Sequence, residues 1–153
     1  MKTLVVYDSV YGNTEIIARA IGDAIPGEVQ VLRVGQVNAG DLEDVDLLIL
    51  GAPTHGAMPS EAMQGLLSRI GSSAREDARA ATFDTRLTWK FLEKWGGFAA
   101  PKMADALVEK GWTLAGEPGG FFVRGLKKGP LKRGEAERAA AWAKELIDSE
   151  WNK

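Results

Sequence analysis

The stretch Ser9–Glu15 has the clearest chemical potential in this sequence. It follows the apolar run Leu4–Tyr7 and precedes a helical pattern. The first amides of a helix have no internal acceptor, and the helix dipole favours an anion beside them. Ser9, Asn13 and Thr14 add side-chain donors, and the stretch contains no Lys or Arg. It therefore predicts a phosphate site built from neutral donors; the alternative is a plain turn in which Asn13 or Thr14 caps the helix.

Composition limits the remaining chemistry. The 153 residues, 45% of them hydrophobic, suit one domain over residues 1–153 with a full core. Cysteine is absent and there is one histidine, which excludes disulfides, thiolate catalysis and a multi-histidine metal site. We therefore predict no metal ligands. A net charge of −2 gives no general case for binding nucleic acid.

The sequence shows no signal for export or membrane insertion. No apolar stretch approaches the roughly 18–20 residues that span a bilayer. The chain starts directly with a strand pattern and shows no charged leader or cleavage site. We therefore expect a cytoplasmic protein without a membrane span.

Strand and helix patterns alternate along the chain, with about five of each. The expected strands are Thr3–Asp8, Glu28–Val34, Asp46–Leu50, Ala78–Phe83, and the short pieces Trp112–Ala115 and Phe121–Val123. The expected helices are Thr14–Ile25, Ser60–Ile70, Ala100–Lys110 and Glu135–Trp151, with a helical turn at Asp41–Asp44 and a short helix around Phe91 and Trp95. Strands joined by helices run parallel, so we predict an α/β fold with an open parallel sheet and helices on both faces.

Three loops would meet at the carboxyl edge of this sheet, where ligands bind in such folds. They are Ser9–Thr14, Gly51–Pro59, and a third loop that we expect to begin at Phe83 and run to Phe98. Each is rich in Gly, Thr, Ser or Pro, which allows a ligand to approach the backbone closely.

On these loops the chain resembles the flavodoxin family over nearly its whole length. The family's first loop reads roughly (S/T)-x-(S/T)-G-N-T-E; Ser9 and Gly12–Glu15 match it, while Tyr11 replaces the middle hydroxyl. The second loop often reads G-x-x-T-W-G. There Gly51, Thr54 and Gly56 match, and His55 replaces the aromatic residue.

The third loop matches the family less well. Flavodoxins often carry Gly-Asp followed by an aromatic residue at this place. Asp84 matches, Phe83 replaces the glycine, and Leu87 stands where the aromatic is expected, with Trp89 two residues further on. Arg86 departs from the acidic residues that the family often has at this edge.

The resemblance implies a single-domain, five-stranded parallel sheet in the order 2-1-3-4-5 that binds FMN. The first loop would bind the phosphate, the backbone near Asp84 would meet the flavin's pyrimidine edge, and Gly56 would turn a carbonyl toward the flavin. No catalytic side chain is implied. The residues expected to bind FMN are Ser9, Val10, Tyr11, Gly12, Asn13, Thr14, Pro53, Thr54, His55, Gly56, Phe83, Asp84, Thr85, Arg86 and Trp89.

Several residues have two interpretations. His55 either contacts the flavin or is a bystander, and Trp89 either covers the ring or packs in the body. The near-neutral charge, Ala57, Arg86 and Lys90 predict a less negative reduction potential than that of acidic flavodoxins. A basic run is either a solvated loop or a docking patch for an acidic partner; it consists of Arg124, Lys127, Lys128, Lys132 and Arg133.

The sequence lacks the residues that other functions of this architecture require. A receiver domain needs an Asp where the third strand ends in Gly51, and a low-molecular-weight phosphatase needs a cysteine. The P-loop and dinucleotide fingerprints are also absent. Three hypotheses remain: an FMN electron carrier that works with a redox partner protein, an FMN oxidoreductase acting on a quinone or porphyrinogen, and a non-catalytic interaction module. We favour the carrier and expect a monomer or weak dimer.

Overall fold

The computed structural model describes residues 1–54, 58–72, 76–87, 97–124 and 130–151. Its strands form one sheet in the order β2-β1-β3-β4-β5, with β6 also paired to β4, and all of these pairings are parallel. The strands are β1 (Lys2–Tyr7), β2 (Glu28–Arg33), β3 (Leu47–Pro53), β4 (Arg79–Leu87), β5 (Thr113–Leu114) and β6 (Gly119–Val123). The predicted fold class and strand order are confirmed.

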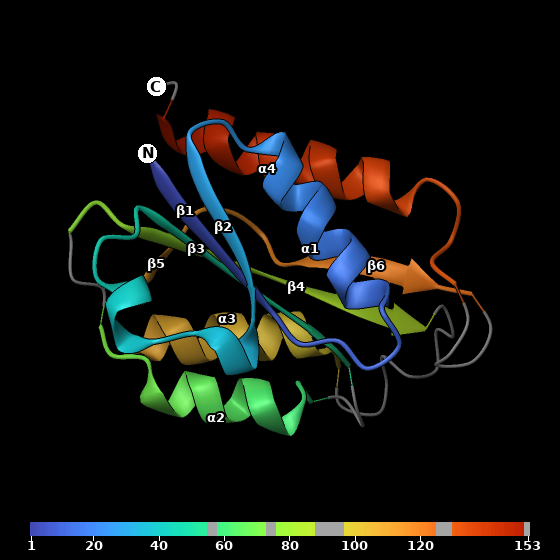
Figure 1. Cartoon of the computed structure of the whole chain (residues 1–153), viewed down its shortest axis with the longest axis horizontal. Helices are drawn as coiled ribbons and strands as arrows, with labels where there is room; N and C mark the ends of the chain where they lie inside the picture. Colours follow the sequence, from blue (N-terminus) through green and yellow to red (C-terminus); the bar gives the residue numbers. More distant parts are fainter. Residues whose placement is uncertain (55–57, 73–75, 88–96, 125–129, 152–153) are drawn as a thin grey trace.

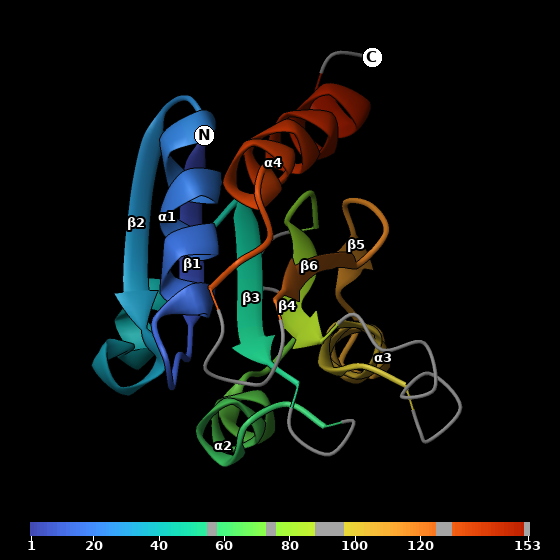
Figure 2. The same ribbon diagram turned by 90° about the vertical axis from the view of Figure 1, so that its right-hand side faces the viewer.

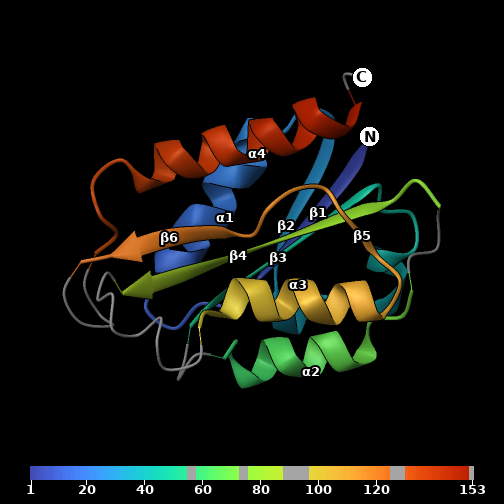
Figure 3. The same cartoon turned by 180° about the vertical axis from the view of Figure 1, so that it is seen from behind.

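The fifth position of the sheet is shared by two short strands. β5 pairs with the beginning of β4, where Arg79 lies opposite Thr113. β6 pairs with its end, where Phe83 lies opposite Gly119. Figure 3 shows β6 running beside the carboxyl-terminal half of β4. These two strands are the two pieces that the sequence predicts around residues 112–123.

Helices cover both faces of the sheet, as predicted. Helices α1 (Asn13–Ala24) and α4 (Glu135–Trp151) lie on one face, and α2 (Glu61–Arg69) and α3 (Ala99–Glu109) lie on the other (Figures 1 and 2). Two 3₁₀ turns, η1 (Val34–Gln36) and η2 (Ala39–Leu42), follow β2, so the expected helical turn begins earlier than Asp41. In the described part of the chain, no helix combines the length and the apolar character needed to cross a membrane.

Each face of the sheet has its own apolar core. The run Leu47–Leu50 in β3 is completely buried. Its side chains alternate between the two faces of the sheet, and helices cover both faces. Under α2 and α3 the core includes Met63, Leu66, Met103 and Leu107. Under α1 and α4 it includes Ile17, Ile21, Phe83, Phe121 and Ala143.

The predicted start of the third loop is wrong. β4 continues beyond Phe83 to Leu87, because β6 offers it a second partner strand through the pairs from Asp84–Gly120 to Leu87–Val123. The polar types of residues 84–86 suggested a loop, but backbone hydrogen bonds decide the conformation there. The side chains of Asp84, Thr85 and Arg86 consequently point alternately to the two faces of a strand.

Candidate functional site

The turn between β1 and α1 leaves the start of the helix open. Gly12 is the N-cap, with φ of 92°, and has no side chain to accept an amide hydrogen bond. The first intrahelical bond runs from the Ile16 amide to the Gly12 carbonyl, at 3.1 Å. The amides of Thr14 and Glu15 precede this bond, where a helix has no internal acceptor. A Cβ placed on Gly12 would meet no atom of the described residues within 4 Å, so the space beside this N-cap is open in the described part of the chain.

The hydroxyl of Ser9 holds this turn in shape. Its Oγ accepts a hydrogen bond from the Gly12 amide at 3.0 Å, and the Ser9 amide donates to Asp8 Oδ1 at 3.0 Å. Because Oγ acts as acceptor in this bond, its own proton can still be donated to a ligand. Val10 and Tyr11, between Ser9 and Gly12, are exposed. Their side chains do not build the turn, and their contribution to a ligand site would come from the backbone.

Thr14 links the first loop to β4. Its Oγ1 lies 2.9 Å from Thr85 Oγ1, and both residues are buried. Two hydroxyls carry two protons, and one of them is enough for the bond between them. The second proton can therefore be donated to a ligand if Thr85 donates to Thr14. Thr85, which the sequence places in the third loop, therefore supports Thr14 in the first loop.

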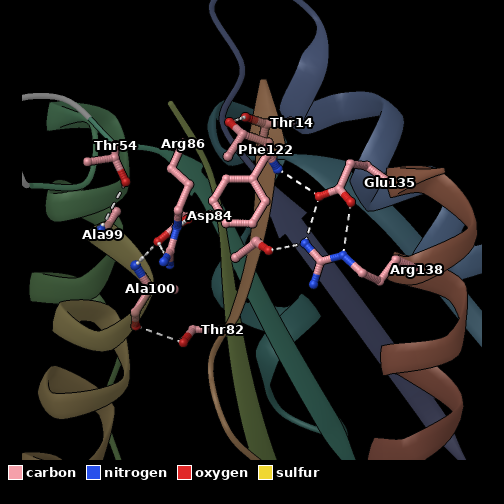
Figure 4. A network of polar contacts seen from close by, with 12 residues as sticks. Thr14, Thr54, Thr82, Asp84, Arg86, Ala99, Ala100, Phe122, Glu135 and Arg138 are labelled. Atoms are coloured by element: carbon pink, nitrogen blue, oxygen red, sulfur yellow. Dashed lines mark hydrogen bonds and ion pairs between the residues drawn. The ribbon is translucent and has the colours of Figure 1, made fainter. Parts of the chain in front are cut away.

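The start of α3, unlike that of α1, is satisfied by side chains from the strand ends (Figure 4). Thr54 Oγ1 accepts a hydrogen bond from the Ala99 amide at 3.1 Å, and Asp84 Oδ2 accepts one from the Ala100 amide at 2.8 Å. Thr82 Oγ1 also donates to the Ala100 carbonyl at 2.8 Å. These bonds fix the beginning of α3 against the ends of β3 and β4. Two of the residues that make them, Thr54 and Asp84, are residues that the sequence predicts to bind FMN.

Asp84 and Arg86 form a buried ion pair on the α3 side of β4. Arg86 Nε and Nη2 donate to the two carboxylate oxygens of Asp84, at 2.6 and 2.7 Å. The Asp84 side chain is 0% exposed and the Arg86 side chain 14%. The guanidinium stacks 3.7 Å from the centre of the Phe98 ring and lies where a Cβ on Gly120 would be.

This pairing changes what Arg86 can do. Burial raises the pKa of Asp84, while the hydrogen bonds and charge of Arg86 and the Ala100 amide oppose that rise. The positive charge of Arg86 is matched at contact distance by one carboxylate, so it adds little net charge at the edge of the sheet. Arg86 is therefore no longer an argument for a reduction potential less negative than that of acidic flavodoxins.

Among the remaining predicted site residues, Asn13 is the first residue of α1 and is half-buried. Phe83 lies in the core under α1 and α4, where its ring packs at 6.2 Å between centres against both Phe121 and Trp142. Pro53 is the last residue of β3 and is half-buried. Residues outside the described part of the chain include His55, Gly56, Ala57, Trp89, Lys90, Phe91, Trp95, Lys127 and Lys128.

Comparison with known proteins decides the family. A family profile described as "Flavodoxin domain" matches residues 4–125. The chain belongs to the flavodoxin family. Among curated protein sequences, none matches this flavodoxin significantly.

Solved flavodoxins share its fold. Oxidised Flavodoxin 1 from Bacillus cereus is 21% identical with a TM-score of 0.77, and the match covers 97% of this chain and 98% of that one. Flavodoxin 2 from the same organism is 25% identical with a TM-score of 0.75, covering 97% and 99%. A short-chain flavodoxin associated with a non-canonical PDU bacterial microcompartment is 17% identical with a TM-score of 0.80, covering 98% and 99%.

The donors of the first loop fit a flavin phosphate in this flavodoxin. The Thr14 and Glu15 amides of α1, the Ser9 hydroxyl and the Thr14–Thr85 pair all lie around the same turn. Such a set suits an anion held by hydrogen bonds at a helix start. Within the described residues, no group of three or more His, Cys, Asp or Glu side chains is placed to bind a metal ion.

Sequence reasoning missed a cation beside this loop. Arg33, the last residue of β2, lies opposite Tyr7 in the parallel register of β1 and β2. Its Nη1 donates to the Ser9 carbonyl at 3.0 Å. The strand order 2-1-3-4-5 was the signal that could have found it, since that order places the ends of β1 and β2 side by side. The first loop itself has no Lys or Arg, but its surroundings do.

A second polar cluster joins α4 to the end of β6 (Figure 4). Glu135 Oε2 accepts hydrogen bonds from the Phe122 amide at 2.7 Å and from Arg138 Nη2 at 2.6 Å, and Arg138 also donates to the Gly120 carbonyl. Burial raises the pKa of Glu135, but these hydrogen bonds and the charges of Arg138 and Lys132 outweigh it and lower the pKa overall.

This cluster predicts a pH-dependent contribution to stability. A lowered carboxyl pKa stabilises the fold above the unfolded pKa of about 4.3, and that contribution is lost as pH falls through the folded pKa. Glu135→Gln should therefore reduce the free energy of unfolding by about 1–3 kcal/mol at neutral pH and by less at low pH. Urea unfolding from pH 3 to 7 measures this. Glu137→Gln, in the same first turn but exposed, is the control; a Glu135→Gln loss that is independent of pH would contradict the interpretation.

Proposed function

We propose that this flavodoxin binds FMN and carries electrons between partner proteins. The observation that carries the proposal is the start of α1, where the Gly12 N-cap has no capping side chain, the space beside it is open among the described residues, and the Thr14 and Glu15 amides precede the first intrahelical bond. An uncharged flavin ring would not need helix amides that lack an internal acceptor, whereas a phosphate would. When bound, FMN would supply the electron-accepting chemistry, and the protein would supply binding and orientation.

The described residues would divide this work. The Thr14 and Glu15 amides and the Ser9 and Thr14 hydroxyls would hold the phosphate, and Thr85 would hold Thr14 in place. The bonds from Thr54 and Asp84 to the start of α3 would keep the second and third loops at a fixed separation. The proposed carrier needs no acid or base from the protein.

Purification with an absorbance spectrum tests the proposal first. The protein should bind FMN, isolated with it or after its addition, and should show a flavin spectrum. With NAD(P)H and quinones alone, turnover should be negligible, because a carrier needs a reductase. A colourless protein that does not take up FMN would support the interaction module instead, and rapid turnover without a partner would support the oxidoreductase.

A matched pair of variants tests the role of Thr14. Thr14→Val and Thr85→Val both lose the hydrogen bond between the two buried hydroxyls and should lose similar stability. Thr85→Val keeps the Thr14 hydroxyl, while Thr14→Val removes it. We expect Thr14→Val to reduce the preference for FMN over riboflavin by roughly tenfold, and Thr85→Val to reduce it much less. Fluorescence titrations with both ligands measure this, and equal changes in the two variants would refute the assignment.

A further inference from the structure

We propose that Arg33 prepares the first loop for a phosphate, as a positioning residue that acts from the neighbouring strand. The inference rests on the proposed function, since it concerns how the loop receives the FMN phosphate. Arg33 ends β2, and β1 and β2 lie side by side beneath α1 (Figure 1). Its guanidinium lies 5.3 Å from the centre of the Tyr7 ring, which places it next to the end of β1.

The hydrogen bond to Ser9 orients the loop backbone. Arg33 Nη1 lies 3.0 Å from the Ser9 carbonyl oxygen. In a trans peptide the carbonyl and the following amide point in opposite directions. Holding the Ser9 carbonyl toward Arg33 therefore turns the Val10 amide away from Arg33, and this amide belongs to the turn that surrounds the open helix start.

Arg33 also offsets the carboxylates that flank the loop. Its Nη1 lies 3.9 Å from Asp8 Oδ1 and its Nη2 lies 3.5 Å from Glu15 Oε1. Asp8 and Glu15 stand immediately before and after the predicted phosphate loop, where two uncompensated negative charges would repel a phosphate. The single Arg33 side chain therefore contacts both of these carboxylates and the loop carbonyl.

Arg19 provides a matched control. It also pairs with Glu15, at 3.0 Å, but its side chain is 59% exposed and the structure shows no hydrogen bond from it to the Ser9 carbonyl, which Arg33 contacts. Removing either arginine changes the net charge by one and frees Glu15 from one partner. Only the Arg33 variant loses the contact with the loop backbone and the charge near Asp8.

The experiment measures dissociation constants of the apoprotein for FMN and riboflavin in wild type, Arg33→Gln and Arg19→Gln. Arg33→Gln should reduce the preference for FMN by roughly five- to tenfold, and Arg19→Gln by less than about twofold. Part of the Arg33→Gln loss should disappear at high salt, because only FMN carries the screened charge. Thermal unfolding of each apoprotein should show that both variants fold.

The outcomes separate this inference from the proposed function. A wild-type protein that does not bind FMN would refute the proposed function. A wild type that prefers FMN, with an Arg33→Gln variant that keeps this preference or weakens both ligands equally, would overturn only the role of Arg33. An equal loss of preference in Arg19→Gln would also overturn it, because general charge would then explain the effect.

Discussion

Asp84→Ala should reduce the free energy of unfolding by about 3–5 kcal/mol, the usual cost of breaking a buried ion pair from one side. The substitution leaves Arg86 without its bidentate partner in a site where the guanidinium is mostly buried. It also leaves the Ala100 amide at the start of α3 without its acceptor. Chemical denaturation of the apoprotein measures the loss without any contribution from a ligand.

An exposed ion pair supplies the control for this prediction. Arg19→Ala breaks the pair with Glu15, which should cost far less than Asp84→Ala because solvent screens the exposed pair. Asp84→Asn should cost less than Asp84→Ala, since the amide oxygen can still accept from Ala100. A loss for Asp84→Ala no larger than that for Arg19→Ala would show that the buried pair does not hold β4 and α3 together.

The partner substitution should add a pH dependence of known sign. Arg86→Met would leave Asp84 buried and unpaired, so its pKa, already raised by burial, would rise further. The folded state would then bind a proton more readily than the unfolded state. The variant should therefore be least stable relative to wild type at neutral pH, and should recover as pH falls toward the ordinary Asp pKa of about 3.9.

Gly51→Ala should destabilise the fold by about 3 kcal/mol through overpacking. A Cβ at this position in β3 would lie 1.9 Å from Cζ of Phe83. That ring has no room to move, because it is fully buried and packs edge to face against Phe121 and Trp142. Gly51 is thus needed for the core, a role that differs from the approach of its backbone to a ligand.

Gly65→Ala is the matched control for this prediction. Gly65 lies on the exposed side of α2, and a Cβ there would meet nothing within 4 Å. Alanine favours a helix interior over glycine by about 0.5–1 kcal/mol, so this variant should be slightly more stable than wild type. Thermal and urea unfolding of both variants test the pair. If Gly51→Ala were as well tolerated as Gly65→Ala, the packing of Phe83 against β3 would be wrong.

The fold was largely predictable because its signals are local. The buried run Leu47–Leu50 and the spaced apolar residues of α1 report strand and helix directly. The connection of strands by helices then restricts the sheet to parallel pairings. Even the division of the fifth strand position was visible as two short apolar pieces around a turn.

The site was less predictable because its decisive contacts join distant residues. Asp84 and Arg86 have loop-like residue types, and only backbone pairing with β3 and β6 shows that they lie in a strand. Thr54 meets Ala99 across 45 positions of sequence, and Arg33 meets Ser9 across 24. The first loop could be predicted as a phosphate site because its donors and its glycine are contiguous in the sequence.

We propose above all that the start of α1 holds the phosphate of FMN. Parallel calorimetric titrations of the wild-type apoprotein with FMN and with riboflavin test it most directly, because the two ligands differ only in that phosphate. Two or more charge-assisted hydrogen bonds should make FMN bind at least roughly 100-fold more tightly. Equal affinities for FMN and riboflavin would contradict the claim.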